Sequence, residues 1–448
     1  MARIAVAMSG GGHRACLFAL GAMMYLADAG RTRQIESVSS VSGGSLANGA
    51  FGQDLDLTKS SAADVEATAQ RVARAVTGRG TLLGRPLTWL YVAALVAFVA
   101  GLVAVWCLPI DIGWRIAVFI AGLLLVAWFA SLRGRVTARA FGKSLYTRDG
   151  RRPRLSDLNT AVDHVICATD LHAGEHVYFS GRFVYAYRFG IGTPGDLPLE
   201  TAVQASAAFP GVFPLVWLRT KRLGFQGGCG RGATAKRLAL HDGGVYDNMG
   251  DQWAHGLDER VERLGELDPG FGGADELVVI SASAGLEYGP VWTCRIPLAG
   301  ELLTLLRDKS VLYDNGNSVR RRELVARFDL AEREGRGLRG CLVHIPQSPF
   351  RLPDTFIRDA AQWPERAERA AAAVAALAGG DEQAARDHWK GVAKRSAAVA
   401  TTLVGFSRER TAELMHHAYV LAMVNLHVVL GYPLEAVPDR ARFDAMVA

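Results

Sequence analysis

Residues 35–45 of the chain are IESVSSVSGGS, a β-rich run that leads into a turn of small residues around Ser42. The pattern predicts a strand over Ile35–Ser39 and a helix that opens at Ser45 and reaches Phe51. A serine on such a turn presents its hydroxyl at a helix N-terminus, where free N–H groups and the helix dipole favour developing negative charge. Ser42 is therefore a candidate nucleophile, although a helix N-cap role would explain a serine here equally well.

The N-terminus repeats the same arrangement. A strand is expected over Arg3–Met8, followed by a glycine turn and a helix over Arg14–Ala29 that ends at Gly30. Strands that alternate with helices predict an α/β sheet. The region after about Arg358 is rich in alanine and is expected to be helical. Further strands are expected over Val162–Ala168, Val177–Phe179, Leu277–Ser281 and Leu342–Ile345.

The glycine turn of the first unit is SGGGHR, residues 9–14. Its three glycines, Gly10, Gly11 and Gly12, let backbone N–H groups converge on one point, which suits an oxyanion or a phosphate. The loop has neither a GxGxxG pattern nor a Lys-Ser/Thr ending, so a nucleotide site is not indicated. A plain glycine-rich turn is the alternative.

Residues 241–248 are HDGGVYDN, in which Asp242 precedes two glycines at an expected strand end. A carboxylate held there could accept the proton of a serine hydroxyl. A surface turn would also use Asp-Gly, and we expect Asp247-Asn248 to be such a turn. The basic stretch Trp217–Lys236 before it is expected to be either a solvated surface loop or a loop at a membrane.

Two long apolar runs lie in the first third of the chain, LTWLYVAALVAFVAGLVAVWCL (residues 87–108) and WRIAVFIAGLLLVAWFASL (residues 114–132). Each is close to the ~20 residues that span a bilayer core, so we expect a transmembrane helical hairpin. Its outer turn would hold Asp111 and Arg115, and arginines flank both inner ends, which places those ends in the cytoplasm. The alternatives are a re-entrant hairpin and a buried hairpin of a soluble core. Five aromatic residues fall near the ends of the runs: Trp89, Tyr91, Trp106, Trp114 and Trp128.

The composition agrees with a membrane location. Half of the 448 residues are hydrophobic, and the net charge of +6 is spread along the chain, which favours mild attraction to anionic membrane surfaces. No nucleic-acid recognition motif accompanies this charge, so we expect no nucleic-acid partner. The six cysteines are far apart and show no CxxC spacing, so neither a metal site nor a disulfide framework is indicated. The N-terminus lacks the apolar length of a secretory signal, which again favours a cytoplasmic catalytic face.

The glycine loop, the serine turn and the Asp-Gly-Gly stretch, in this chain order, resemble the patatin-like phospholipase family. Three further stretches support the resemblance: ATDL with Gly174-Glu175 (from residue 168), ASAAFPGVFP (residues 205–214) and TTL (residues 401–403) before a helix at Glu413–Tyr419. The chain departs from the family pattern at Ser40, where the serine turn usually begins with glycine. It also carries the apolar hairpin between the nucleophile unit and Asp242.

The resemblance implies a three-layer α/β/α fold and a Ser-Asp dyad. Ser42 would attack an ester carbonyl, Asp242 would act as general base and then general acid, and the N–H groups of Gly10, Gly11 and Gly12 would stabilise the oxyanion. No cofactor or metal is implied, and we expect His13 and His241 to be structural or to shape the pocket. The expected organisation is a patatin-like sheet domain in two parts (1–80 and 137–348), an inserted transmembrane hairpin (86–133) and a helical C-terminal region (349–448).

The leading hypothesis is therefore a serine acyl hydrolase of the phospholipase A or lysophospholipase type, acting on membrane lipid at the cytoplasmic face. A neutral-lipid lipase, a thioesterase or an acyltransferase would use the same acyl-enzyme chemistry, because the motifs do not specify the leaving group. A non-catalytic membrane effector or scaffold that keeps the fold is a further alternative.

Overall fold

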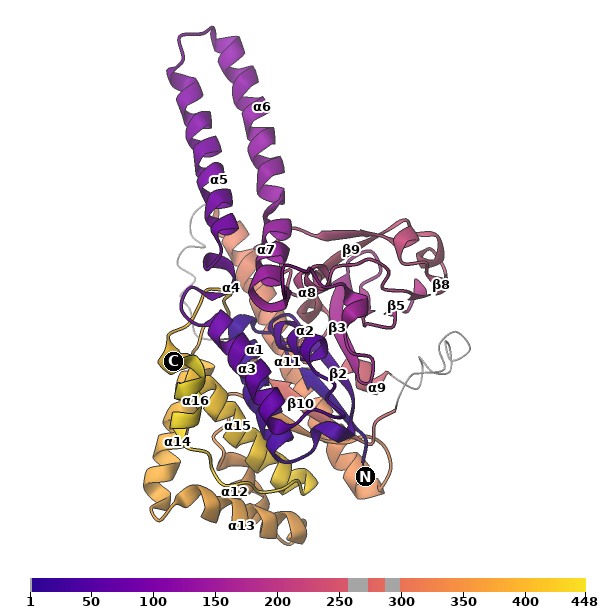
Figure 1. Cartoon of the computed structure of the whole chain (residues 1–448), viewed down its shortest axis with the longest axis vertical. Helices are drawn as coiled ribbons and strands as arrows, with labels where there is room; N and C mark the ends of the chain where they lie inside the picture. The colour runs from indigo at the N-terminus through magenta and orange to yellow at the C-terminus, as the bar shows by residue number, and fades with distance from the viewer. Residues whose placement is uncertain (1, 257–272, 287–298) are drawn as a thin grey trace.

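The computed structural model of the chain describes residues 2–256, 273–286 and 299–448. A mixed sheet lies at its centre, with helices on both faces and a two-helix hairpin that projects from one end (Figure 1). The strands are β1 (Ile4–Met8), β2 (Ile35–Val41), β3 (Asp163–Asp170), β4 (Glu175–Phe179), β5 (Val184–Ala186), β6 (Gly190–Gly192), β7 (Val216–Arg219), β8 (Gln226–Gly227), β9 (Arg237–Asp242), β10 (Glu276–Ser281) and β11 (Arg339–His344).

The sheet has a parallel half and an antiparallel half. Strands β11, β10, β1, β2 and β3 lie side by side in this order and run parallel. From β3 onward, β4, β5, β6 and β8 continue the sheet with antiparallel pairing. Strand β9 pairs antiparallel with both β3 and β7. The loops of the candidate site follow β1, β2 and β9, and β3 pairs with both β2 and β9.

Helices cover the sheet and extend the chain beyond it. They are α1 (Gly12–Asp28), α2 (Gly43–Asp54), α3 (Ala62–Val76), α4 (Gly80–Leu83), α5 (Pro86–Ala104), α6 (Ile112–Ser131), α7 (Arg133–Phe141), α8 (Leu199–Ser206), α9 (Gln252–His255), α11 (Ala299–Glu334), α12 (Arg351–Arg358), α13 (Pro364–Ala378), α14 (Glu382–Ala397), α15 (Arg408–Leu430) and α16 (Arg440–Val447).

Strand β1 shows how the layers are built, because side chains alternate between the two faces of a strand. Ile4, Val6 and Met8 belong to the large core that includes α1 and α15. Ala5 and Ala7 face the other way and belong to a second core with side chains of α11. The central sheet is therefore buried on both faces, which confirms the expected α/β/α class.

The C-terminal region is part of this core. Helices α1 and α15 are buried along most of their length. Their backbones approach closely at Gly21, where a Cβ would lie 2.1 Å from the carbonyl oxygen of Met415. The expected helical character after Arg358 is confirmed.

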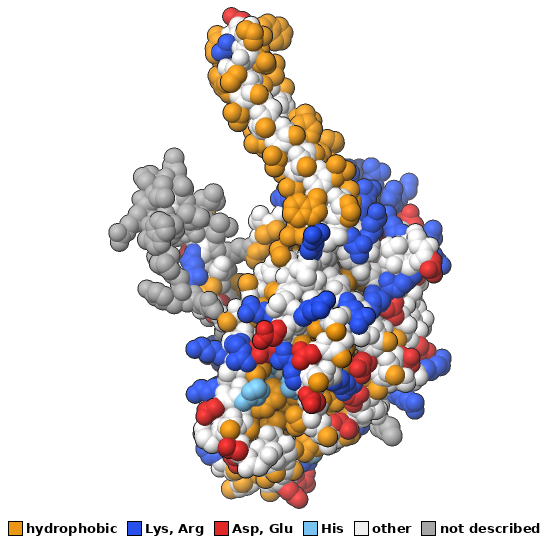
Figure 2. All heavy atoms as spheres, turned by 60° about the vertical axis from the view of Figure 1, so that its left-hand side comes forward, with side chains coloured by type: hydrophobic (Ala, Val, Ile, Leu, Met, Phe, Trp, Pro, Cys, Tyr) orange, Lys and Arg blue, Asp and Glu red, His pale blue; other side chains and the backbone are white. Residues whose placement is uncertain are grey.

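The two apolar runs form helices α5 and α6, as expected. Neither has a buried residue, their large apolar side chains are exposed, and such side chains run along the face of the hairpin that Figure 2 shows. Asp111 caps the N-terminus of α6 by accepting a hydrogen bond from the N–H of Gly113 at 2.8 Å. An exposed helix pair that is apolar on every side is not a soluble core element, so the buried-hairpin alternative is wrong.

The six strands expected from the sequence are all present, but the long helix α11 is not predicted by the pattern. Residues 313–318, YDNGNS, carry strong turn residues in the middle of α11. The sequence also gave no indication of β5 to β8, which are short strands of two to four residues.

The turn after β2 and the glycine loop after β1 are in direct backbone contact. A Cβ on Gly43 would lie 1.9 Å from the carbonyl oxygen of Gly12, and a Cβ on Gly44 would lie 2.7 Å from that of Met8. Only glycine allows this approach.

We predict that Gly43→Ala lowers the free energy of unfolding by at least about 2 kcal/mol, because the added methyl group forces the two loops apart. Thermal unfolding of the purified protein in detergent measures the change. Gly316→Ala in α11 is the matched control, since open space surrounds Gly316 and alanine favours a helix by up to about 1 kcal/mol. Equal unfolding temperatures for Gly43→Ala and wild type would contradict the contact.

Candidate functional site

Ser42 lies on a strained turn between β2 and α2. Its φ of 50° and ψ of −115° are unusual for a residue with a side chain, and such a conformation costs on the order of 1–3 kcal/mol. Ser42 occupies the N-cap position of α2, yet its side chain makes no capping hydrogen bond. The capping explanation of Ser42 is therefore wrong, and its hydroxyl lines a pocket instead.

A buried hydroxyl holds the backbone of this turn in place. The N–H of Ser42 donates to Oγ of Ser206 at 2.9 Å, and that hydroxyl donates to the carbonyl oxygen of Cys167 at 2.6 Å. Ser206 ends helix α8 and is completely buried. The stretch at residues 205–214 thus reaches the turn through Ser206 and ties it to β3.

The serine at position 40 belongs to the same polar network. Its hydroxyl accepts hydrogen bonds from Nδ2 of Asn48 at 2.8 Å and from Oγ of Ser45 at 3.0 Å. Asn48 Oδ1 in turn lies 2.7 Å from Nδ1 of His164, and burial lowers the pKa of His164 to about 4. His164 is therefore neutral near pH 7. A serine in place of the usual glycine is tolerated because its hydroxyl has partners in the core.

Asp242 comes to the site from a segment that lies far from Ser42 in the sequence. It ends strand β9, where Ala168 of β3 is its antiparallel partner. Its N–H donates to the carbonyl oxygen of Ala208 at 3.1 Å, and its carboxylate Oδ1 accepts the N–H of Gly244 at 2.8 Å. The side chain is 4% exposed and lines the same pocket as Ser42.

Strand β3 pairs with both β2 and β9 and so brings Ser42 and Asp242 together. Val41, which precedes Ser42, pairs with Cys167, and Asp242 pairs with the next residue, Ala168. Because β4 pairs with the opposite edge of β3, β9 pairs with the same edge as β2, just beyond the residue at which β2 ends. The end of β2 and the end of β9 therefore meet at one point of the sheet.

The glycine loop is fixed to the loop after Asp242. The N–H of Gly10 donates to the carbonyl oxygen of Asn248 at 2.9 Å, whereas the N–H groups of Gly11 and Gly12 have no acceptor within the described residues. Asn248 Nδ2 donates to Oγ of Ser283 at 2.6 Å, and its Oδ1 would lie 2.3 Å from a Cβ on Gly10. Gly10 thus anchors the loop, and Gly11 and Gly12 keep free donors.

Asp247 and Asn248 are not a surface turn, which corrects the expectation. Their side chains are 1% and 3% exposed, respectively. Asp247 accepts the N–H groups of Met249 and Gln252, each at 3.0 Å, and lies 3.3 Å from Arg320 of α11. The motif HDGGVYDN could have suggested a structural role for both side chains, because the loop has to carry Asp242 at a fixed position.

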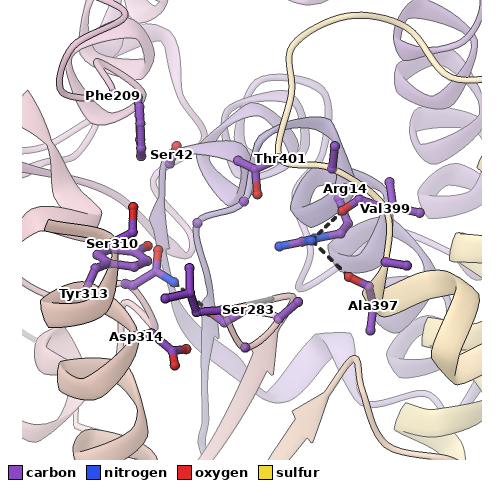
Figure 3. A pocket seen from close by; sticks show the side chains of 18 of the residues that line it. Arg14, Ser42, Phe209, Ser283, Ser310, Tyr313, Asp314, Ala397, Val399 and Thr401 are labelled. Carbon is purple, nitrogen blue, oxygen red and sulfur yellow. Dashed lines mark hydrogen bonds between the residues drawn. The ribbon is translucent and has the colours of Figure 1, made fainter. Parts of the chain in front are cut away.

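The pocket above these residues has a volume of about 370 Å³. Ser42 and Phe209 lie at one end in Figure 3, and Tyr313 and Ser310 of α11 lie on one wall. Phe209 and Leu286 line it and are 45% and 38% exposed, so its opening is apolar. This opening suits a hydrocarbon chain.

Arg14 forms the opposite side of the pocket, a role that sequence analysis did not assign. Its Nη1 donates to the carbonyl oxygens of Val399 at 2.5 Å and Ala397 at 3.4 Å, as the dashed lines in Figure 3 show. The side chain is 6% exposed and has no carboxylate partner in the described part of the chain. A buried cation without a counter-ion adds positive potential to the pocket.

His13 is structural, as expected. Its Nδ1 lies 3.0 Å from the carbonyl oxygen of Val404, and its Nε2 lies 2.9 Å from Oγ1 of Thr81. Burial lowers the pKa of His13 to about 4. The ring therefore joins the glycine loop to α4 at the base of the hairpin and to the C-terminal region. His241 is a buried residue of β9.

Asp251 follows the Asp242 loop and forms a buried acidic pair with Asp247. Burial and the charge of Asp247 raise the pKa of Asp251 to about 8. For Asp247, burial opposes ionisation, but the charges of Arg320 and His176 and the hydrogen bond from the N–H of Gln252 act together and lower its pKa. Arg320 is 3.5 Å from Asp251, so one cation serves two carboxyl groups.

We predict that Asp251→Asn makes the thermal stability of the protein less sensitive to a rise in pH. A raised folded-state pKa contributes stability below the ordinary pKa of aspartate, and this stability is lost as the pH rises toward the folded-state value. The unfolding temperature of the wild type should therefore fall more steeply than that of Asp251→Asn between about pH 5 and about pH 8. The exposed Asp196→Asn should keep the wild-type slope, and equal slopes for all three proteins would refute the raised pKa.

Solved structures resemble the chain at low identity, and two of them are of the following proteins. Human GIVD cytosolic phospholipase A2 is 13% identical with a TM-score of 0.36, and the match covers 69% of this chain and 45% of that chain. VipD from Legionella pneumophila is 14% identical with a TM-score of 0.29, and the match covers 100% of this chain and 90% of that one. This chain thus spans less than half of the human protein. The comparison with curated proteins gave no match.

The family comparison is more specific. The model described as "Patatin-like phospholipase" matches residues 6–250, which is more than half of the chain. The matched region contains the glycine loop, the Ser42 turn and the Asp242 loop, together with the hairpin between them. This chain belongs to the patatin-like phospholipase family.

Proposed function

We propose that the protein is a serine hydrolase that cleaves fatty-acyl esters of membrane lipids through Ser42 and Asp242. Family membership implies lipid acyl hydrolase activity in general. The observation that carries the finer proposal is the meeting of Ser42 and Asp242 along one edge of β3, in a pocket that also receives the glycine loop.

The chemistry follows from these groups. The carboxylate of Asp242 takes the proton of the Ser42 hydroxyl as Oγ attacks the ester carbonyl. It returns that proton to the leaving alcohol when the C–O bond breaks, which leaves an acyl-enzyme on Ser42. A water molecule then gives its proton to Asp242 and attacks the acyl group, and the fatty acid leaves as Ser42 regains its proton.

The oxyanion of each tetrahedral intermediate needs donors that are not already committed. We assign this role to the N–H groups of Gly11 and Gly12, because the N–H of Gly10 is held by Asn248. This narrows the expected set of three glycines to two donors. The strained turn and the buried network below it keep the Ser42 hydroxyl close to these donors without reorganisation.

The pocket suits an amphiphilic ester. Its opening carries Phe209 and Leu286, and its far side carries the guanidinium of Arg14. The apolar side chains would receive an acyl chain, and Arg14 would attract an anionic group such as a lipid phosphate or the carboxylate of the released fatty acid. The same features support a phospholipid or a lysophospholipid as the substrate.

We further propose that α5 and α6 span a membrane and hold the catalytic domain at its cytoplasmic face. Both helices are long and apolar enough to do so. Arg85 precedes α5, and Arg133, Arg135 and Arg139 follow α6, which favours a cytoplasmic location of both ends. Such tethering keeps the pocket close to water-insoluble substrate.

We predict that Ser42→Ala and Asp242→Asn each lower fatty acid release from phospholipid vesicles by at least about a thousandfold, because each removes a reacting group. Mass spectrometry of the released fatty acids measures the rate and identifies the substrate. The exposed Ser156→Ala is the matched serine control and should keep the wild-type rate. Equal release by wild type and Ser42→Ala on phospholipid, lysolipid and neutral-lipid panels would contradict the proposal.

Two cysteines allow the topology to be tested. Cys107 is exposed near the outer turn of the hairpin, whereas Cys229 is partly exposed in the loop after β8; Cys16, Cys167 and Cys341 are buried. We predict that a membrane-impermeant maleimide labels Cys107 and not Cys229 in right-side-out vesicles, and Cys229 and not Cys107 in inverted ones.

Variants that retain only one of these two exposed cysteines give the assignment, with Cys294, which lies outside the described residues, replaced by serine. Labelling of both positions from the same side would show that the hairpin does not cross the membrane.

A further inference from the structure

A second groove lies at the base of the hairpin, apart from the catalytic pocket. It has a volume of about 650 Å³ and lies between the end of α6, helices α7 and α8, and strand β7. None of its lining residues lines the pocket of Ser42. Beside the groove, Nε of Arg133 at the start of α7 donates to the carbonyl oxygen of Val212, in the segment before β7, at 2.7 Å.

The groove is positively charged. Arg135 and Arg139 of α7 line it one helical turn apart, and both are exposed. Neither forms an ion pair with a described residue. Arg152 also lines the groove, but its charge is offset by the buried carboxylate of Glu200, with which it is paired. Figure 2 shows basic side chains gathered on the body where the apolar hairpin leaves it.

A buried polar donor also faces this groove. Gln204 of α8 lines it, and its side chain is 3% exposed. The Nε2 amide has no hydrogen-bond partner within the described residues, and it would lie 3.5 Å from a Cβ on Gly134. A buried amide without a partner is unfavourable unless a ligand or water completes its hydrogen bonds.

Aromatic and apolar side chains complete the lining. Trp128 lies in the last turn of α6 and Trp217 in β7, and they are 60% and 52% exposed. Tryptophan favours the headgroup layer of a bilayer, and Trp128 is at the inner end of a proposed membrane span. Leu132 and Leu215 also line the groove. The groove therefore combines exposed apolar side chains with two arginines that have no carboxylate partner among the described residues.

We infer that this groove binds one anionic phospholipid of the cytoplasmic leaflet, with the phosphate held by Arg135, Arg139 and Gln204 and the upper acyl chain against Trp128 and Trp217. The site is distinct from the catalytic pocket, and the bound lipid is a ligand there and not a substrate. The inference rests on the membrane insertion proposed above, but it does not depend on hydrolysis.

The test is native mass spectrometry of the full chain in detergent, titrated separately with phosphatidylglycerol and with phosphatidylcholine of the same acyl chains. A Ser42→Ala background prevents turnover of the lipid. We expect one phosphatidylglycerol to be retained in preference to phosphatidylcholine. Arg135→Gln with Arg139→Gln should weaken its binding by about 25-fold, or about fivefold for each arginine near a membrane surface.

Gln204→Leu keeps the charge and the approximate volume, and it should weaken binding about tenfold through the lost hydrogen bond to the phosphate. Arg358→Gln with Lys390→Gln is the charge-matched control, because both residues are exposed and belong to α12 and α14, which lie away from the hairpin in Figure 1. It should bind as the wild type does. Gln204→Leu also keeps the test decisive if the arginine variant fails to fold.

Three results would each overturn the site. The first is equal retention of the two lipids, and the second is an equal loss of phosphatidylglycerol binding in the arginine variant and the distant control. The third is displacement of bound phosphatidylglycerol by an equal concentration of inorganic phosphate. Carbonate extraction of membranes that contain the wild type separates this failure from that of membrane insertion. A protein that resists extraction but shows no lipid preference is inserted without the site, whereas a protein released by carbonate is not inserted.

Discussion

The contact between the backbone of the Ser42 turn and the backbone of the glycine loop is the constraint on which the site depends. Gly43 packs against the carbonyl of Gly12, so the two loops that follow β1 and β2 form one unit. The same loop is held by Asn248 through Gly10 and lies against Thr402, whose carbonyl oxygen would be 2.4 Å from a Cβ on Gly12. The glycine loop is therefore in direct contact with three other segments of the chain: the Ser42 turn, the loop of Asn248 and the segment of Thr402.

Polar groups in the core make this arrangement rigid. The hydroxyl of Ser206 fixes the N–H of Ser42, and the network of Ser40, Ser45 and Asn48 lies directly below the turn. Such networks are costly when only partly satisfied, and they specify one geometry when their partners are present. The positive φ of Ser42 persists because these bonds and the packing of Gly43 and Gly44 determine it from both sides.

Much of the architecture was predictable from local patterns. The central strands, the glycine loop and the hairpin carry their own periodicity and turn residues, so an α/β sheet and the inserted helices followed from these patterns. The three-layer α/β/α class was implied by the family resemblance. Helix α11 did not follow from the local patterns, because Asp314 to Asn317 favour a turn locally and only packing of Leu324 and Phe328 against β1 and β10 makes the segment helical.

The position of Ser42 and Asp242 as a pair was suggested by family resemblance. Their common edge on β3 depends on long-range strand pairing, which no local pattern contains. The same is true of the bond from Gly10 to the carbonyl of Asn248 and of the bond from Arg14 to Val399, each of which joins residues more than 200 positions apart.

The central claim is that Ser42 is an activated nucleophile, and covalent labelling tests it most directly. A fluorophosphonate reacts with an activated serine by loss of fluoride, and peptide mass spectrometry locates the adduct. The account predicts a single adduct on Ser42, formed by the wild type in membranes and much more slowly by Asp242→Asn. An unlabelled Ser42 in a folded, membrane-inserted protein, or an adduct on another serine that survives Ser42→Ala, would contradict it.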